Sequence, residues 1–110
     1  MDKDTEKKLG QLQMIEQNLQ GLLMQKQQFQ TQLIEIESAL KELETAKESY
    51  KIVGNIMVSS NKEDLKKDLN QKKETVELRI KSVEKQEKNL REKAGGMQSE
   101  IVKELKPEKK

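Results

Sequence analysis

The feature that most limits how this chain can fold is a repeat of apolar residues at alternating spacings of three and four. The repeat runs through the N-terminal half, where Lys26 interrupts it. Its apolar members are Leu12, Ile15, Leu19, Leu22, Phe29, Leu33, Ile36, Leu40 and Leu43. Such heptad spacing places one narrow apolar stripe along a helix, and the stripe must be buried against another helix. We therefore expect a helix over about residues 4–49.

A second heptad series follows Asn61. Its apolar members are Leu69, Val76, Ile80, Val83, Leu90, Ala94, Met97 and Ile101, with Lys73 and Glu87 as charged interruptions. Ser60 or Asn61 can cap the N-terminus of this helix, and Pro107 can end it. We expect a helix over about residues 62–105 and a disordered tail over 106–110.

Residues 50–60 break the helical spacing. β-Branched and aromatic residues gather there on both sides of Gly54-Asn55, a pair that tolerates the positive φ of a two-residue hairpin turn. This predicts strands at 50–53 and 56–60. Because the connection is short, the flanking helices must be antiparallel neighbours. The prediction is a single, mainly α domain over residues 1–110, a long antiparallel two-helix coiled coil with a central β-hairpin.

The predicted hairpin is apolar on both strands, which points to assembly. Two strands alone are marginally stable in water and leave two open edges. We expect them to pair with strands of other chains and to close into an intersubunit β-barrel, which removes the edges. The alternative is a hairpin that folds onto its own helices. The residues expected to drive assembly are Tyr50, Ile52, Val53, Ile56, Met57 and Val58.

The amino-acid composition limits the classes of function that the chain can have. Charged residues make up 38% of the 110 residues and hydrophobic residues 32%, which is too little apolar surface for a large globular core. The net charge of only +2 argues against nucleic acid as a partner. With no His, no Cys, no phosphate-binding loop and no metal-ligand motif, the sequence predicts no enzyme and no cofactor. It also shows no membrane span or signal peptide, so we expect a cytoplasmic protein.

Antiparallel helices would bring both chain ends together at a tip far from the hairpin. Met14 and Val102 fall off the heptad series there and are the best candidates for exposed contacts, since Met suits promiscuous surfaces. Gly95-Gly96 interrupts the expected helix in the same region. The two glycines indicate either a flexible tip or simple fraying of the helix end. The candidate tip residues are Leu9, Leu12, Met14, Ile15, Leu19, Met97, Ile101, Val102 and Leu105.

Several segments resemble one known family. Residues 50–58, Tyr-Lys-Ile-Val-Gly-Asn-Ile-Met-Val, resemble the hairpin of prefoldin beta-class subunits. Residues 62–65, 73–80 and 84–87 are similar to that family's second helix, and residues 25–27 to the middle of its first. The hairpin and the Glu-Thr-x-x-Leu-Arg segment carry the resemblance, because coiled-coil helices all look alike in composition.

The resemblance implies an archaeal-type hexamer of two alpha-class and four beta-class subunits with six projecting coiled coils. It implies an ATP-independent chaperone that captures unfolded polypeptides at the coil tips and passes them to a group II chaperonin. The basic residues Lys106, Lys109 and Lys110 would then be candidates for docking on the chaperonin. The competing hypothesis is a coiled-coil scaffold or tether without chaperone activity.

Overall fold

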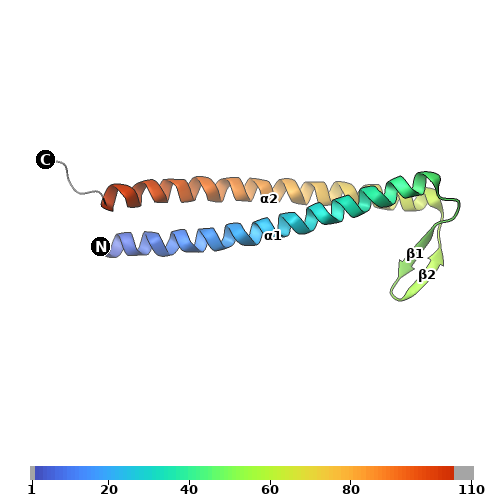
Figure 1. The fold of residues 1–110 in the computed structure, drawn as a ribbon, viewed down its shortest axis with the longest axis horizontal. Helices are drawn as coiled ribbons and strands as arrows, with labels where there is room; N and C mark the ends of the chain where they lie inside the picture. The colour runs from blue at the N-terminus through green and yellow to red at the C-terminus, as the bar shows by residue number, and fades with distance from the viewer. Residues whose placement is uncertain (1, 106–110) are drawn as a thin grey trace. The chain divides into compact units, whose positions relative to one another are not determined.

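A computed structural model describes residues 2–105. The chain forms α1 (Lys3–Thr45), β1 (Tyr50–Val53), β2 (Ile56–Ser59) and α2 (Lys62–Leu105) in that order (Figure 1). Contacts divide the described chain into two units. The terminal unit contains residues 2–26 and 82–105, and the hairpin unit contains residues 27–81. The predicted mainly helical fold with a central hairpin is confirmed.

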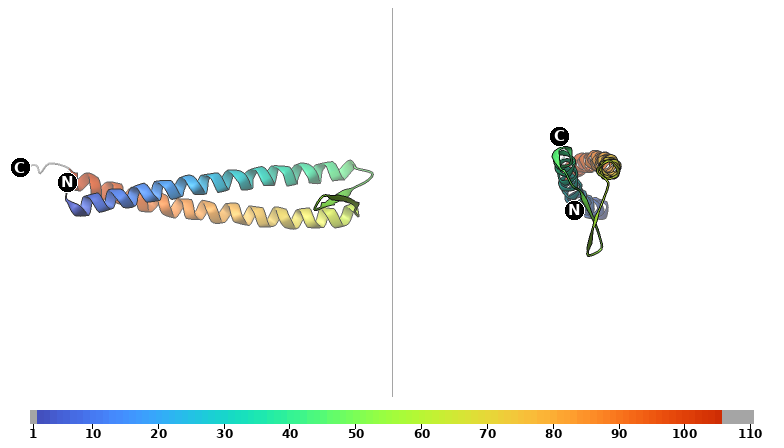
Figure 2. Two further views of the ribbon diagram at one scale, coloured as in Figure 1. Left: turned by 90° about the horizontal axis from the view of Figure 1, so that it is seen from below. Right: turned by 90° about the vertical axis from the view of Figure 1, so that its right-hand side faces the viewer.

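In the terminal unit, the first part of α1 lies beside the last part of α2 (Figure 2). The Lys8 ammonium contacts Glu104, whereas the Lys26 ammonium contacts Glu84. Residue numbers therefore fall along α2 as they rise along α1, so the two segments are antiparallel. The buried apolar side chains of this unit belong to the predicted heptad series: Ile15, Val83, Ala94 and Ile101.

The hairpin unit repeats the arrangement. Lys73 contacts Glu37 at 3.9 Å, and the Arg79 guanidinium lies 5.9 Å from the centre of the Phe29 ring. Leu43 and Val76 are its buried apolar side chains, and both occupy predicted heptad positions. Burial of one stripe per helix explains why a chain so rich in charge still forms a packed helix pair.

The charged interruptions of the heptad series meet one another. The Lys26 ammonium lies 3.5 Å from the Glu84 carboxylate and 3.7 Å from that of Glu87, which Arg91 also contacts at 3.6 Å. The Lys26 and Glu87 side chains are only 21% and 15% exposed. Lys26 thus lies within the interface opposite a charge of the other sign, which favours a register-setting polar position over a side chain that leaves the interface.

Helix α1 ends at Thr45, so the prediction that it reaches Ser49 is wrong. The physical reason lies in the other helix. The Lys62 ammonium donates hydrogen bonds to the carbonyl oxygens of Glu44 and Ala46, at 3.1 and 3.4 Å, and these groups belong to the end of α1. A cation at a helix C-terminus satisfies free carbonyls and complements the helix dipole. Residues 46–49, with a bend at Lys47, then connect α1 to β1.

Helix α2 begins as predicted. The Asn61 side-chain oxygen accepts a hydrogen bond from the backbone N–H of Glu63 at 2.8 Å, so Asn61 rather than Ser60 is the N-cap. Glu63 and Asp64 lie in the first turn, where negative charge is favourable. The predicted end at residue 105 also agrees with the structure, while the tail expected over 106–110 lies outside the described residues.

Candidate functional site

The β-hairpin is the first candidate site. Its strands are antiparallel with Val53 opposite Ile56, which leaves Gly54-Asn55 as a two-residue turn. Gly54 has φ of +62°, and within residues 2–105 no residue other than glycine has positive φ. A glycine at the first turn position therefore supplies the conformation that this tight turn requires. Strand β2 ends at Ser59, one residue before the predicted end.

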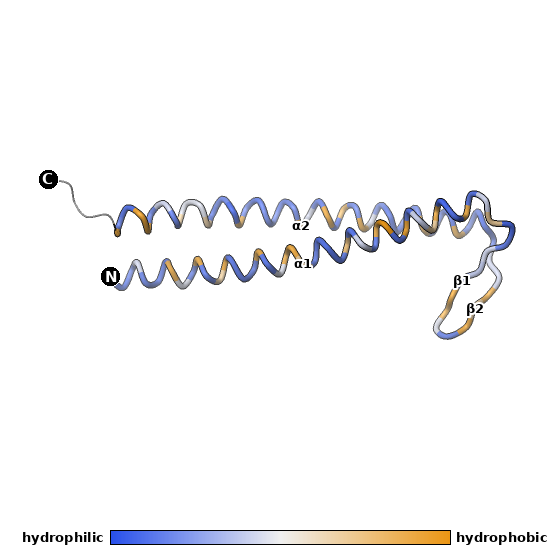
Figure 3. The backbone as a smooth tube through the Cα atoms, viewed as in Figure 1, coloured by the Kyte–Doolittle hydropathy of each residue, from blue (hydrophilic) through white to orange (hydrophobic). Residues whose placement is uncertain are grey.

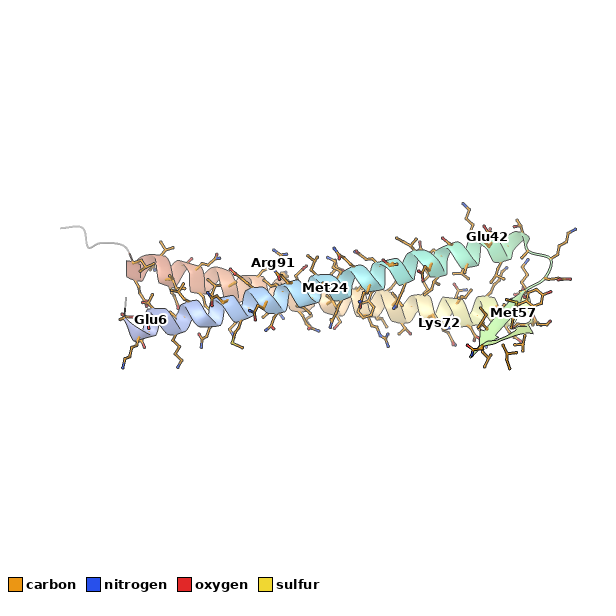
Figure 4. The ribbon with its side chains drawn as sticks, turned by 60° about the horizontal axis from the view of Figure 1, so that its bottom comes forward. Glu6, Met24, Glu42, Met57, Lys72 and Arg91 are labelled. Atoms are coloured by element: carbon orange, nitrogen blue, oxygen red, sulfur yellow. The ribbon has the colours of Figure 1, made fainter. Side chains whose placement is uncertain are left out.

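Every residue of both strands is exposed, on both faces of the hairpin. The strands carry the apolar colour in Figure 3, and Figure 4 labels Met57 on the hairpin. The six predicted assembly residues are exposed to the following extents: Tyr50 51%, Ile52 68%, Val53 56%, Ile56 66%, Met57 64% and Val58 42%. Apolar side chains gathered this densely in the open make the hairpin a candidate interaction surface.

Polar contacts hold the base of the hairpin together and connect it to α2. The Ser49 hydroxyl donates to the Ser60 carbonyl at 2.7 Å, and the Ser60 N–H donates to the Ser49 carbonyl at 3.0 Å. Lys51 contacts Asp68 of α2 at 3.8 Å. The Tyr50 hydroxyl donates to the Glu48 carboxylate at 2.5 Å, and this bond raises the pKa of Tyr50. These contacts hold the hairpin at its base and leave its apolar strands uncovered.

A shallow groove of about 440 Å³ lies between β1 and the helices of the hairpin unit. Its wall from the hairpin is Tyr50, Lys51 and Ile52, and its helical wall is mostly apolar or small: Ala39, Leu43, Ala46, Leu65 and Leu69. The charged residues Glu42, Asp68 and Lys72 complete the lining. Because every strand residue stays exposed, the hairpin is not buried against its own helices, which the alternative prediction required.

The ends of the terminal unit are the second candidate site. Of the nine predicted tip residues, Met14, Val102 and Leu105 are exposed, at 65%, 53% and 54%. Ile15 and Ile101 are buried, at 6% each. The half-buried ones are Leu9, Leu12, Leu19 and Met97. The exposure expected of Met14 and Val102 from their place off the heptad series is confirmed. The predicted docking residues Lys106, Lys109 and Lys110 lie outside the described residues.

Sequence reasoning missed a polar cluster at this end, which we call the terminal clasp: Thr5, Lys8, Glu100 and Glu104. Thr5 is only 2% exposed, and its hydroxyl donates to the Glu104 carboxylate. The Lys8 ammonium contacts the other Glu104 oxygen at 2.5 Å and Glu100 at 3.5 Å. Hydrogen bonds from Lys8 and Thr5 lower the pKa of Glu104, and the bond to Glu104 raises that of Lys8.

A signal for the terminal clasp was present in the sequence. Thr5 and Lys8 precede Leu12 at spacings of seven and four, and Glu104 follows Ile101 at three, so they continue the heptad series with polar residues. Asp2 stabilises the N-terminus of α1. Its carboxylate accepts a hydrogen bond from the Thr5 backbone N–H at 2.8 Å and so caps the helix. That hydrogen bond lowers the pKa of Asp2.

A groove of about 360 Å³ opens beside the heptad residues of the terminal unit. Met14 and Met97 face it from the two helices, next to the edge of Ile15, and the polar lining comes from Gln11, Asn18 and Lys93. Two flexible methionines and two amides form a surface that can adapt to apolar segments of varied shape.

Within residues 2–105, no group of three or more His, Cys, Asp or Glu side chains is placed to hold a metal ion. Both described helices also fall short of the length of continuous apolar sequence needed to cross a membrane.

Comparisons with known proteins agree with this geometry. The family described as Prefoldin subunit matches residues 6–108. The chain is 41% identical to Prefoldin subunit beta of Archaeoglobus fulgidus over 103 residues, covering 91% of this chain and 89% of that protein. It is 39% identical to Prefoldin subunit beta of Thermococcus onnurineus, covering 90% and 88%. The crystal structure of the prefoldin beta subunit from Thermococcus strain KS-1 superposes with a TM-score of 0.91, at 35% identity, covering 97% and 96%.

Proposed function

Because the chain belongs to the prefoldin subunit family and so has the role of a chaperone subunit, we propose that it is a beta-class holdase component acting without ATP in the cytoplasm. In this proposal it captures unfolded polypeptides with its terminal unit and delivers them to a group II chaperonin. Family membership implies a hetero-oligomer with other prefoldin subunits. We infer two alpha-class and four beta-class copies, joined through their hairpins in a β-barrel.

The observation that carries the proposal is the exposed hairpin. Its six apolar side chains are uncovered on both faces, and both outer strand edges are unpaired within residues 2–105. Open edges and apolar side chains together favour strand addition from another chain. A scaffold that assembled through its helices would gain nothing from such a surface.

The assembly step can be tested by charging the hairpin. Ile56→Asp with Val58→Asp should abolish the hexamer formed with an alpha-class subunit, because carboxylates cannot be buried in a barrel without partners. Helix content should stay the same. The measurements are particle mass by light scattering and helicity by circular dichroism.

The matched control places the same two charges on exposed apolar helix positions of the same unit. Ile34→Asp with Leu78→Asp alters side chains that are 64% and 66% exposed and should leave the particle at its full mass. A hairpin variant that also keeps the full mass would refute assembly through the barrel.

Client capture is proposed at the terminal unit. The exposed Met14, Val102 and Leu105 are available for contact without rearrangement. Leu9, Leu12, Ile15, Leu19, Met97 and Ile101 would add to the contact surface if the two helix ends separated. We propose that Lys106, Lys109 and Lys110 contribute to docking on the chaperonin.

Truncation tests this assignment. Deletion of residues 1–12 and 99–110 should preserve the hexamer and weaken suppression of aggregation of a guanidinium-denatured protein, followed by turbidity. Equal protection by the truncated hexamer would reject the terminal site. If the full-length hexamer gave no protection, the scaffold hypothesis would replace the chaperone proposal.

A further inference from the structure

Residues 10–25 of α1, in the terminal unit, are almost free of charge. Between Gly10 and Gln25, Glu16 is the only charged residue. The α2 segment of the same unit carries charges over residues 84–93 and again over residues 100–104, while residues 94–99 carry none. Apart from residues 94–99, this part of α2 is thus far more charged than residues 10–25 of α1.

Amides and apolar side chains fill the uncharged segment. Met14 is 65% exposed, Leu23 45% and Met24 64%. Met14 and Met24 both lie off the heptad series on the outside of α1, about 15 Å apart along the helix, and Figure 4 labels Met24. The amide side chains on this segment are all exposed: Gln11, Gln13, Gln17, Asn18, Gln20 and Gln25. We call the exposed side chains of residues 10–25 the neutral face.

The neutral face is continuous with the groove of the proposed client site. Met14 lines that groove together with Gln11 and Asn18, and Met97 faces it from α2. Surface of the same chemistry therefore extends from the groove along α1 to Met24, beyond the residues already considered as tip contacts.

The chemistry of the face fits an extended polypeptide rather than a folded partner. Exposed amides can both donate and accept hydrogen bonds, and an unfolded chain offers free backbone N–H and C=O groups for them. A folded protein has already paired most of these groups. The scarcity of charge means that the face neither selects nor repels a client by the sign of its charge.

A second copy of this chain is a poorer fit. A stable protein–protein interface buries roughly 800 Å² on each partner, with a packed apolar centre. Three apolar side chains that point in different directions around one helix do not form such a centre. They suit weak contacts at several points along a flexible chain, with methionine adapting to each.

We propose that the neutral face is a second client-binding surface, which holds extended apolar segments of unfolded polypeptide through Met14 and Met24 and through its amides. This inference rests on the proposed holdase function. It adds a stretch of binding surface along α1, so that clients contact the side of the terminal unit as well as its end.

The test introduces charge without changing net charge. Gln17→Lys with Met24→Glu places two opposite charges seven residues apart on the neutral face. Lysine and glutamate are both good helix formers, so the helix should be retained. The matched control is Ser82→Lys with Asn89→Glu, which places the same charges at the same spacing on exposed positions of α2 in the same unit. Hexamers assembled with the alpha-class subunit are compared for suppression of aggregation of reduced lysozyme, which is basic, and reduced α-lactalbumin, which is acidic.

The neutral-face variant should need roughly fivefold more hexamer for half-protection of both clients, the effect expected from losing one well-placed contact. The α2 variant should behave like the unmodified hexamer. Equal protection by both variants would overturn the neutral face while the proposed function stands. If the neutral-face variant changed the particle mass but not the protection, the face would be an interface between copies, and the client-binding proposal would be overturned. If the unmodified hexamer protected neither client, the proposed function would fail and the neutral face with it.

Discussion

Replacing glycine by alanine at two kinds of position should change stability in opposite directions. Gly95 and Gly96 lie within the continuous helix α2, and an added Cβ at either would meet no atom within 4 Å. Gly54 is equally open but has φ of +62°. The same chemical change therefore tests backbone conformation alone, because no side-chain packing is gained or lost at these positions.

The magnitudes follow from the backbone. Alanine is favoured over glycine inside a helix by about 1 kcal/mol, so Gly95→Ala with Gly96→Ala should stabilise α2 locally by about 2 kcal/mol. In the left-handed region an L-residue costs roughly 1–2 kcal/mol, so Gly54→Ala should destabilise the hairpin by that amount. The predicted tip flexibility would be reduced by the first pair of changes.

Hydrogen exchange of the assembled hexamer measures both effects locally. Amides of α2 around residues 92–100 should exchange up to roughly 30-fold more slowly in the double alanine variant, since 2 kcal/mol corresponds to about that factor. Amides of β1 and β2 should exchange faster in Gly54→Ala. If the α2 amides exchanged at an unchanged or higher rate, the helix would not be continuous through Gly95-Gly96 in the assembly, and the reasoning would be refuted.

Three further changes probe the polar groups. The hydrogen bond from Lys8 lowers the pKa of Glu104 in the folded protein. The stabilisation from Glu104 is therefore present above the unfolded pKa of the carboxyl group and is lost as the pH falls through the lowered value. Spin labels on the two helix ends should separate in acid, and Glu104→Gln should separate them already at neutral pH. Lys26→Leu or Glu87→Leu alone should destabilise the helix pair, while the double change should recover stability, with a coupling of roughly 0.5–3 kcal/mol in a guanidinium denaturation cycle. Asn61→Ala should cost about 1 kcal/mol in the same assay, and an unchanged midpoint would show that the cap contributes nothing.

The fold was largely predictable because its determinants are local or periodic. The heptad spacing around residues such as Leu12 and Val76 identifies the buried stripe of each helix, and Asn61 has the side chain of an N-cap. Gly54-Asn55 marks the turn without any knowledge of the rest of the chain. Each of these signals depends on residues within a few positions of one another, which is where sequence patterns are most informative.

The features that were not predicted depend on residues far apart in sequence. Helix α1 ends at Thr45 because Lys62, from the start of α2, satisfies its carbonyl groups. Thr5 and Lys8 read as solvated residues until Glu104 is placed opposite them. Polar residues at heptad positions are ambiguous alone, because the same side chain can pair across an interface or point to water.

For the candidate sites, the sequence shows directly which side chains are apolar, but it predicts less accurately which of them are exposed for contact. All six hairpin residues are exposed, because two strands cannot cover one another's faces. At the terminal unit the nine candidates divide into buried, half-buried and exposed ones, since a residue one position along a helix is turned by about 100°. Met24 also lies off the heptad series, but it was not among the candidates because the predicted tip residues of the first helix end at Leu19.

The charged layer at Lys26 and Glu87 explains how the terminal unit selects one register. A slip of one heptad would leave leucine–leucine and leucine–isoleucine contacts almost unchanged, so the apolar stripe alone discriminates poorly. The same slip would place Lys26 against Ala94 and Glu87 against Leu33, so that Lys26 and Glu87, both half-buried, would each lose the partner of opposite charge. Unpaired buried charges cost several kcal/mol, whereas the pair itself adds little net stability. The layer therefore acts mainly by penalising wrong registers, and the correct register is the one that brings Lys8 to Glu104.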